Sequence, residues 1–217
     1  MPEVILNGPE GRLEGRYHHS KLPNPPIAIV LHPHTQFGGT MNNPIVHQLY
    51  YAFVNRGFSV LRFNFRGAGR SQGVFDHGAG ELSDAASALD WLQSINKDAR
   101  TCWIAGFSFG SWISMQLLMR RPEVDSFISV APPANLYDFS FLAPCPSSGL
   151  MVSGDSDTVV PSDEVTKLVE RLKTQRGIVI DHEVVPGANH FFENCDEGLM
   201  EVINAYLDKR LAEGKKP

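Results

Sequence analysis

Cysteine is scarce in this sequence, and the spacing of the cysteines excludes two common kinds of stabilising site. Cys102, Cys145 and Cys195 are odd in number, and no two of them stand at CxxC spacing. A disulfide framework and a cysteine-based zinc site both need paired cysteines. We therefore expect three reduced thiols and no structural metal.

No apolar run in the sequence is long enough to cross a membrane. Region 22–55 contains no Asp, Glu, Lys or Arg, but prolines, histidines and amides interrupt it, and its longest aliphatic run is IAIVL. A transmembrane helix needs about 20 mostly apolar residues in a row. The opening, MPEVILNGPEGRLEG, has an early acid and lacks both the basic start and the apolar stretch of a signal peptide. These absences favour a cytoplasmic protein without a membrane partner.

Positive charge is also sparse and scattered along the chain. The 19 Lys and Arg residues are outnumbered by 24 Asp and Glu residues, which gives a formal net charge of −5 at pH 7. Nucleic acids and acidic membrane surfaces are bound by clusters of Lys and Arg, and the sequence has no such cluster. A small-molecule partner is therefore expected rather than a nucleic acid, and a homodimer is left open.

Short apolar runs rich in Val, Ile and Phe alternate with longer runs of helical period. The strand-like runs are IAIVLH, FSVLRFNF, TCWIAGF, SFISVA, GLMVSG and IVIDHEVV. The helix-like runs are NPIVHQLYYAFVNRG, ELSDAASALDWLQSI, GSWISMQLLMRRP, SDEVTKLVERLKTQ and EGLMEVINAYLDKRLAE. This alternation is typical of an α/β fold, with a mostly parallel sheet covered by helices on both faces. Since no repeat or linker interrupts the pattern, residues 1–217 are expected to form one domain.

The opening of the chain departs from this alternation. In EVILNGPEGRLEGRYHHS, the turn-forming segment GPEG lies between two short runs that alternate polar and apolar residues. Such a pattern predicts a hairpin. We therefore expect an antiparallel edge at the N-terminus of an otherwise parallel sheet.

The segment IAGFSFGSW frames one serine with two glycines. Ser108 falls where the predicted strand CWIAGF ends and the predicted helix GSWISMQLLMRR begins. In that context G-x-S-x-G is the pattern of a nucleophile elbow, a turn so tight that Gly106 and Gly110 must leave room. Such a turn presents the serine at the carboxyl edge of the sheet, near the positive end of a helix. We predict that Ser108 is a nucleophile and that the main-chain amide of Phe109 is one oxyanion-hole donor.

A serine hydroxyl needs a base to attack at neutral pH, and the base needs an acid that orients it. The predicted strand IVIDHEVV is followed by PGANHFF, which offers His190 as the base. The strand GLMVSG is followed by DSDTVVP, which offers Asp155 and Asp157. The chain order Ser, Asp, His is that of α/β-hydrolases. In one interpretation Asp157 is the acid; in the other Asp155 is the acid and Asp157 only caps the following helix.

These motifs resemble the α/β-hydrolase superfamily over nearly the whole chain. In many such enzymes a G-D-x-D-x-x-V-P run precedes the last strand, and its second acid belongs to the catalytic triad. The matching run here is GDSDTVVP. The resemblance therefore implies a triad of Ser108, Asp157 and His190, and an α/β-hydrolase fold.

Three further runs are similar to a narrower group, a small cap-less bacterial branch related to the dienelactone hydrolases. They are HPHTQFGGTMNN, RFNFRGAGRSQGVFD and GAGELSDAASALDWL. Dienelactone hydrolases carry cysteine at the elbow, whereas this chain has Ser108. The difference favours ordinary esters over lactones as substrates.

The loop HPHTQFGG follows the first central strand, where such hydrolases supply the second oxyanion-hole donor. By analogy with H-G-x-P loops, the main-chain amide of His34 is the predicted donor, and Thr35 is the next candidate and a predicted substrate contact. A rival hypothesis assigns His32 and His34 to a metal. The intervening Pro33 argues against the continuous strand that would point both side chains the same way. We expect neither a metal nor any other cofactor.

Closely spaced glycines in GAGRSQG raise the hypothesis of a nucleotide site. The segment lacks the G-x-G-x-x-G spacing and the downstream acid of a dinucleotide site, and it has no GK[ST] of a P-loop. We expect these glycines to turn the chain beside the site. Arg66 and Arg70 would then pair with acids such as Glu81 or face solvent, and recognition of a substrate carboxylate by Arg66 is the alternative.

The segment APPANLYDFSFLAPCPSS separates the strand that ends near Val130 from the next strand, and it is too short for a cap domain. Leu136 and Phe139 are predicted to contact substrate from a turn that overhangs the pocket, and ordinary packing at the rim is the alternative. An open, partly apolar site suits short to medium acyl chains.

The expected function is that of a serine carboxylesterase that acts on a small-molecule ester through an acyl-enzyme intermediate. A second hypothesis keeps the triad but changes the bond to an amide, a lactone, a thioester or a peptide. A third is a non-catalytic ligand-binding relative, which would normally lack a triad residue, whereas all three are present in this chain.

Overall fold

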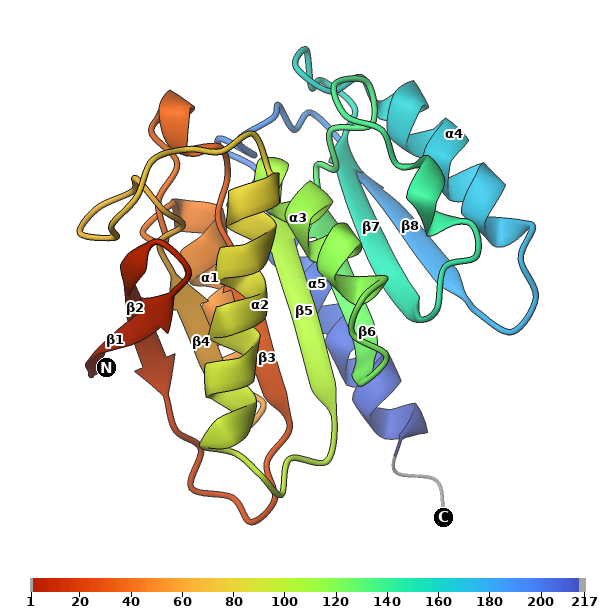
Figure 1. Cartoon of the computed structure of the whole chain (residues 1–217). Coiled ribbons are helices and arrows are strands. Elements are labelled where there is room, and N and C mark those ends of the chain that lie inside the picture. The colour runs from red at the N-terminus through yellow and green to blue at the C-terminus, as the bar shows by residue number, and fades with distance from the viewer. Residues whose placement is uncertain (1, 215–217) are drawn as a thin grey trace.

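One eight-stranded sheet organises the chain in the computed structural model, which describes residues 2–214 (Figure 1). The strand order is β1-β2-β4-β3-β5-β6-β7-β8. The strands are β1 (Glu3–Gly8), β2 (Gly11–His18), β3 (Ile27–Leu31), β4 (Ser59–Phe63), β5 (Cys102–Phe107), β6 (Val124–Val130), β7 (Ser148–Gly154) and β8 (Ile180–Val185). The pairs β1/β2 and β2/β4 are antiparallel, and all other pairs are parallel. The predicted α/β fold with a mostly parallel sheet is confirmed.

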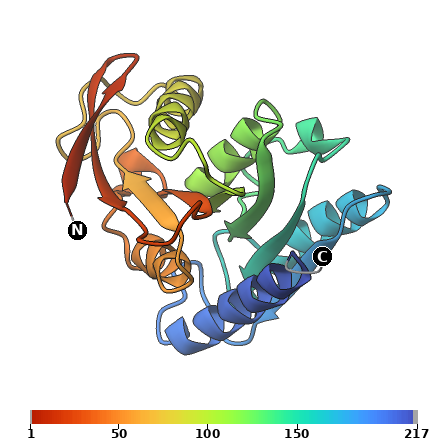
Figure 2. The ribbon, with the colours of Figure 1, turned by 90° about the horizontal axis from the view of Figure 1, so that it is seen from below.

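Helices cover both faces of the sheet (Figure 2). They are α1 (Pro44–Val54), α2 (Ala79–Ser94), α3 (Phe109–Leu118), α4 (Ser162–Lys173) and α5 (Asp196–Glu213). The apolar sides of α2, α3 and α4 belong to one hydrophobic cluster, and those of α1 and α5 belong to a second cluster on the opposite face. Within residues 2–214, no helix combines the length and the apolar character that a membrane span requires.

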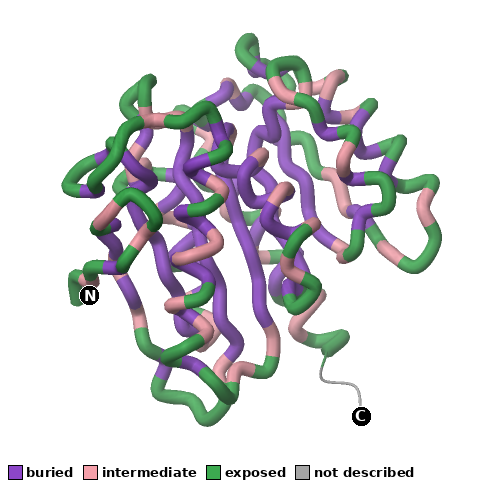
Figure 3. Tube along the Cα trace, in the orientation of Figure 1, coloured by how far each residue is buried: buried purple, intermediate pink, exposed green. Residues whose placement is uncertain are grey.

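The central strands form because their side chains are apolar in both directions. In β3, Ile27, Ile29 and Leu31 enter the cluster beneath α2 and α3, whereas Ala28 and Val30 enter the cluster beneath α1 and α5. Successive side chains of a strand point to opposite faces, so a strand buried on both faces needs a continuous apolar run. Figure 3 shows the result, with the central strands buried along their length and the exposed residues concentrated in loops.

The predicted hairpin is also confirmed. The strands β1 and β2 pair from Glu3 with Arg16 to Gly8 with Gly11. Gly11 adopts φ +117°, a value that L side chains rarely reach, which explains why glycine closes this turn. Leu6 and Leu13 bury their side chains in the cluster beneath α2 and α3, so the hairpin extends the sheet rather than standing apart.

The parallel arrangement brings several loops to one edge of the sheet. The carboxyl ends of β3, β5, β6, β7 and β8 point to the upper edge in Figure 1, and the loops that follow them meet there. Open α/β sheets bind ligands at this edge. The segment 131–147 between β6 and β7 contains a single 3₁₀ helix, η2 (Ser140–Leu142), and as predicted it forms no cap domain.

Candidate active site

Ser108 occupies a strained turn between β5 and α3. Its backbone has φ 52° and ψ −121°, a conformation that a non-glycine residue adopts only when its surroundings hold it there. The two framing glycines allow the close packing around it. A Cβ at Gly106 would collide with the carbonyl of Gly110, and a Cβ at Gly110 would collide with the carbonyl of Leu31. Neighbouring backbone therefore leaves no room for a side chain at Gly106 or at Gly110.

Three polar side chains from different loops form a continuous hydrogen-bond chain. His190 follows β8, and its Nε2 lies 2.9 Å from Ser108 Oγ. The other ring nitrogen, Nδ1, lies 2.8 Å from Asp157 Oδ2. Because the carboxylate can only accept, Nδ1 carries the proton and Nε2 is free to accept the serine proton. Both His190 and Asp157 are buried, so water competes little for these bonds.

The structure brings Asp157, and not Asp155, to the histidine. Asp155 is exposed, and its Oδ1 accepts hydrogen bonds from the Gly187 amide at 2.7 Å and from a neighbouring serine hydroxyl. In Asp157, Oδ2 faces His190 while Oδ1 accepts the amides of Val159 and Val160, each at 2.8 Å. The two amides hold the carboxylate in place. The alternative considered from the sequence, in which Asp157 caps the following helix, is not observed, because no side chain caps α4 and the two bonded amides belong to the turn before it.

Two main-chain amides near the serine are free to bind an anion. The amide N–H of Phe109 is at the start of α3, where a helix provides no internal acceptor. The amide of His34 likewise has no hydrogen-bond acceptor among the described residues. The loop of His34 is held by a hydrogen bond from the Gly39 amide to the His34 carbonyl and by one from the Gln36 amide to His34 Nδ1. Together with the positive end of α3, these groups favour negative charge beside Ser108.

A largely apolar cavity of about 420 Å³ opens above Ser108. Of the predicted oxyanion-hole donors and substrate contacts, His34, Phe109 and Leu136 line it. Thr35 is not among the lining residues, and Phe139 is buried in the hydrophobic cluster, where its ring stacks on Phe141. The structure therefore does not bring Thr35 and Phe139 into the cavity.

Sequence reasoning missed several residues of the cavity wall. They are Pro33, Phe37, Gly38, Gly39, Asn43, Pro133, Val159 and Phe191. One local signal was present, because Phe191 directly follows His190. The remaining residues come from three separate loops, and nothing in their spacing indicates that they meet.

The arginines of the glycine-rich segment are structural in this arrangement. Arg66 donates to both carboxylate oxygens of Asp84, with Nε at 3.0 Å and Nη2 at 2.8 Å, and these bonds raise the pKa of Arg66. Arg70 pairs with Glu3 and Glu14. The expected partner Glu81 instead accepts main-chain amides at the start of α2. The prediction that Arg66 pairs with an acid is correct, but that acid is Asp84 and not Glu81.

His32 supports the loop that carries His34. Its Nδ1 lies 2.6 Å from the Pro33 carbonyl, and its Nε2 accepts the Phe65 amide at 2.9 Å. Both ring nitrogens are thus engaged by backbone groups, and neither is available to a metal. Complete burial lowers the pKa of His32 to about 4.

This buried imidazole predicts a pH-dependent stability. In the unfolded chain this histidine has a pKa of 6.5, whereas in the folded chain the pKa of His32 is about 4. Between these two pH values the unfolded state therefore binds a proton that the folded state does not bind. The stabilisation is therefore complete above pH 6.5 and is lost as the pH falls towards 4. We expect the change in unfolding free energy between pH 7 and pH 5 to be smaller by about 2 kcal/mol in His32→Asn than in the wild type. Urea unfolding at the two pH values measures it, and equal changes in both proteins would contradict it.

Known proteins that are similar to this chain have the same fold, and a family model matches more than half of the chain. A family model described as X-Pro dipeptidyl-peptidase (S15 family) matches residues 13–143, a range that contains His34 and Ser108. A crystal structure from Agrobacterium tumefaciens, of a protein of unknown function described as a candidate α/β-hydrolase, is 65% identical. It superposes with a TM-score of 0.96 and covers 100% of both chains.

Two further proteins are similar over nearly the full length. A crystal structure from Xanthomonas campestris, described as an α/β serine hydrolase without a lid, is 32% identical, with a TM-score of 0.86 and coverage of 96% of this chain and 94% of that one. An uncharacterised protein of Rickettsia prowazekii is 53% identical over 95% of this chain and 89% of its own length. None of these proteins is described as a dienelactone hydrolase, so that narrower relation stays a prediction.

Proposed function

The chain belongs to the α/β-hydrolases, in the family that the X-Pro dipeptidyl-peptidase (S15) model describes, and on this premise we propose that it hydrolyses short to medium-chain carboxylic esters. One observation carries the proposal. Ser108, His190 and Asp157 form a hydrogen-bonded chain at the base of an apolar cavity that is open to solvent. A hydrolase of this kind needs a nucleophile, a base and an orienting acid in that order.

In the proposed mechanism, Ser108 Oγ attacks the ester carbonyl while its proton passes to His190 Nε2. Asp157 stabilises the resulting imidazolium through its bond to Nδ1. The amides of Phe109 and His34 bind the oxyanion of the tetrahedral intermediate. Collapse of the intermediate breaks the ester bond, and the alcohol leaves with the proton from His190.

Deacylation repeats the same proton transfers with water in place of serine. Water gives a proton to His190 as its oxygen attacks the acyl-enzyme, and the proton returns to Ser108 Oγ when the carboxylic acid leaves. One ester and one water thus yield one acid and one alcohol. Every step uses groups of this chain and no cofactor.

The cavity favours an ester over the N-terminal dipeptide that the family description names. A dipeptidyl-peptidase must bind the ammonium group of a free peptide N-terminus, for which a carboxylate is the usual partner. Among the described residues that line the cavity, none is Asp or Glu. A neutral acyl ester needs no such partner. Amides, lactones and thioesters share the triad chemistry, so a panel of all four substrate classes, with Ser108→Ala as the blank, tests the assignment.

The open cavity predicts a preference for short acyl chains. We expect kcat/KM on p-nitrophenyl esters to peak between about two and six acyl carbons, because methylenes beyond the cavity stay in water and forgo about 0.8 kcal/mol of burial each. A concentration series for each ester, kept below its solubility limit, measures this. Efficiency that rises steadily beyond about ten carbons would show a deep acyl tunnel and contradict the prediction.

A further inference from the structure

Exposed large apolar side chains gather around the mouth of the cavity. Eleven large apolar side chains are exposed in residues 2–214, and four of them line the cavity above Ser108. These four, Phe37, Leu136, Val159 and Phe191, are between 44% and 87% exposed. We call them the rim. Isolated exposed apolar residues need no explanation, but a contiguous group around a concave site marks an interaction surface.

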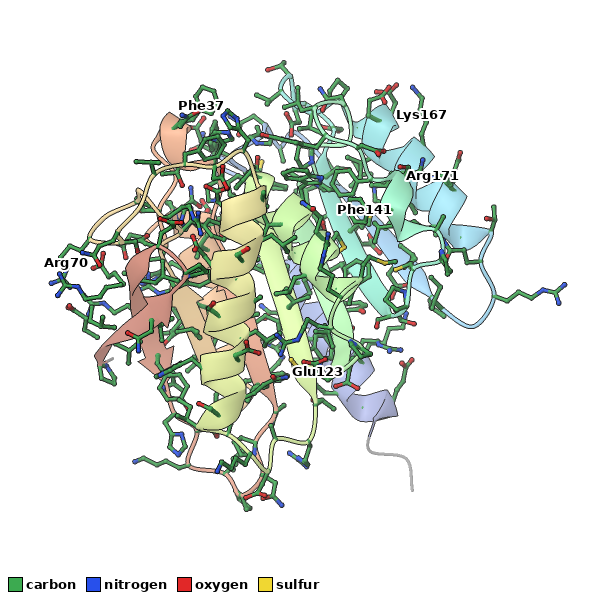
Figure 4. All side chains as sticks on the ribbon, viewed as in Figure 1. Phe37, Arg70, Glu123, Phe141, Lys167 and Arg171 are labelled. Carbon is green, nitrogen blue, oxygen red and sulfur yellow. The ribbon has the colours of Figure 1, made fainter. Side chains whose placement is uncertain are left out.

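The rim is assembled from four loops that follow different strands. Phe37 lies in the 3₁₀ helix η1 (Thr35–Phe37) after β3, Leu136 follows β6, Val159 follows β7 and Phe191 follows β8. Phe37 is the most exposed of them at 87%, and Figure 4 shows it at the upper margin of the molecule, at the edge where these loops meet. Anything large that contacts the rim therefore faces the opening that leads to Ser108.

The loops that carry the rim contain Asp and Glu but no Lys or Arg. Segments 33–43, 131–138, 155–161 and 186–194 have no Lys or Arg, whereas Asp155 and Glu193 are exposed beside the rim. The labelled cations Lys167 and Arg171 lie on α4 at the margin of segment 131–138 (Figure 4). Acids accompany them there, because Lys167 pairs with Asp163 and Glu164 and Arg171 lies near Asp138. A surface rich in anionic lipid would be repelled by this arrangement, whereas an uncharged surface would not.

We propose that the rim docks the chain onto the surface of an aggregated, electrically neutral ester, such as a droplet of a short-chain triacylglycerol. The inference rests on the proposed function and names the physical form of its substrate. Burial of the rim in the droplet removes apolar area from water and places the cavity mouth against the ester. No lid has to open first, because the segment 131–147 leaves the cavity open. A protein partner on the rim would instead cover Ser108.

The chain offers a matched pair of variants for the test. Leu136→Ser with Val159→Ser removes two aliphatic side chains of the rim. Leu22→Ser with Val179→Ser removes the same two residue types, at 50% and 57% exposure, from the opposite edge, where β3 and β8 begin. Both double variants also carry Ser108→Ala, so that the droplets are not consumed and binding is measured without catalysis.

Flotation of tributyrin droplets measures docking directly. We expect the bound-to-free ratio of the rim variant to fall at least about tenfold relative to Ser108→Ala alone, and that of the control variant to stay within about twofold. Droplets coated with phosphatidylglycerol should bind less protein than droplets coated with phosphatidylcholine. Equal loss in both double variants, or stronger binding to the phosphatidylglycerol coat, would overturn the proposal.

Kinetics with intact Ser108 separate this proposal from the proposed function. The wild-type rate on tributyrin should rise more steeply once the ester exceeds its solubility limit, and the rim variant should lose that rise. If soluble p-nitrophenyl butyrate is not hydrolysed, the proposed function fails while flotation can still succeed. If it is hydrolysed but the rise is absent, the docking proposal fails alone. A dimer that light scattering detects and that the rim variant dissociates would also overturn it, by assigning the rim to a second copy of the chain.

Discussion

Replacing Ser108 by Ala, or His190 by Ala, is expected to lower kcat/KM on a soluble ester by at least about 10³-fold. Without Oγ there is no nucleophile. Without the imidazole the serine proton loses its acceptor, His190 Nε2, which lies 2.9 Å from Ser108 Oγ. Because both groups act in one step, the second substitution removes little that the first has left. The double variant should therefore be no more than a few-fold slower than the slower single variant.

Steady-state kinetics on p-nitrophenyl butyrate measure all three variants, and the residual rate is compared with the buffer background. Ser156→Ala serves as a control, because this hydroxyl is exposed in the same set of loops and, within residues 2–214, bonds only to Asp155. Its kcat/KM should stay within about twofold. Losses that multiply in the double variant would show that the two residues act independently, which contradicts the assigned roles.

Replacing Asp157 by Asn is expected to lower kcat on the order of 10² to 10⁴-fold with little change in KM. The amide oxygen of Asn can still accept the Val159 and Val160 amides, as Oδ1 does now. Its nitrogen then faces His190 Nδ1 and donates to it, which moves the imidazole proton to Nε2. An imidazole in that tautomer cannot accept the serine proton.

The matched control is Asp155→Asn, which changes the neighbouring acid in the same loop. Its carboxylate accepts hydrogen bonds from Gly187 and Ser156 and does not contact the histidine, so kcat should fall by less than about threefold. Urea unfolding of both variants shows whether the fold is retained. A larger loss in Asp155→Asn than in Asp157→Asn would reassign the acid.

The predictions that succeeded depend on periodic or local patterns. Apolar runs predicted the buried strands because both faces of a central strand must be apolar, as in Ile27 to Leu31. The G-x-S-x-G run predicted the turn at Ser108 because close packing of backbone against Gly106 and Gly110 tolerates no Cβ. Each requirement is satisfied within a few residues, so it is visible in the sequence.

The predictions that failed concern directions of side chains in loops. Phe139 is a predicted substrate contact but is buried in the hydrophobic cluster and does not line the cavity, whereas Phe37, which the sequence does not single out, lies on the rim. Both are aromatic residues in loops between strands and helices, and only the backbone path decides whether such a ring turns inward. Arg66 forms the predicted kind of ion pair, but with Asp84 rather than with Glu81, whose carboxylate accepts amides at the start of α2.

By itself, the sequence determined the alternation of strands and helices, the hairpin, the elbow and the order of serine, acid and histidine. It did so because the periods of strands and helices and the demands of a tight turn act over short distances along the chain. Only the tertiary structure decided that Asp157 reaches His190, which amides beside Ser108 are free, and that four apolar side chains surround the cavity. These features join loops that are far apart in the sequence, such as those of Asp157 and His190, which are 33 residues apart. Their geometry exists only where the carboxyl ends of the strands meet.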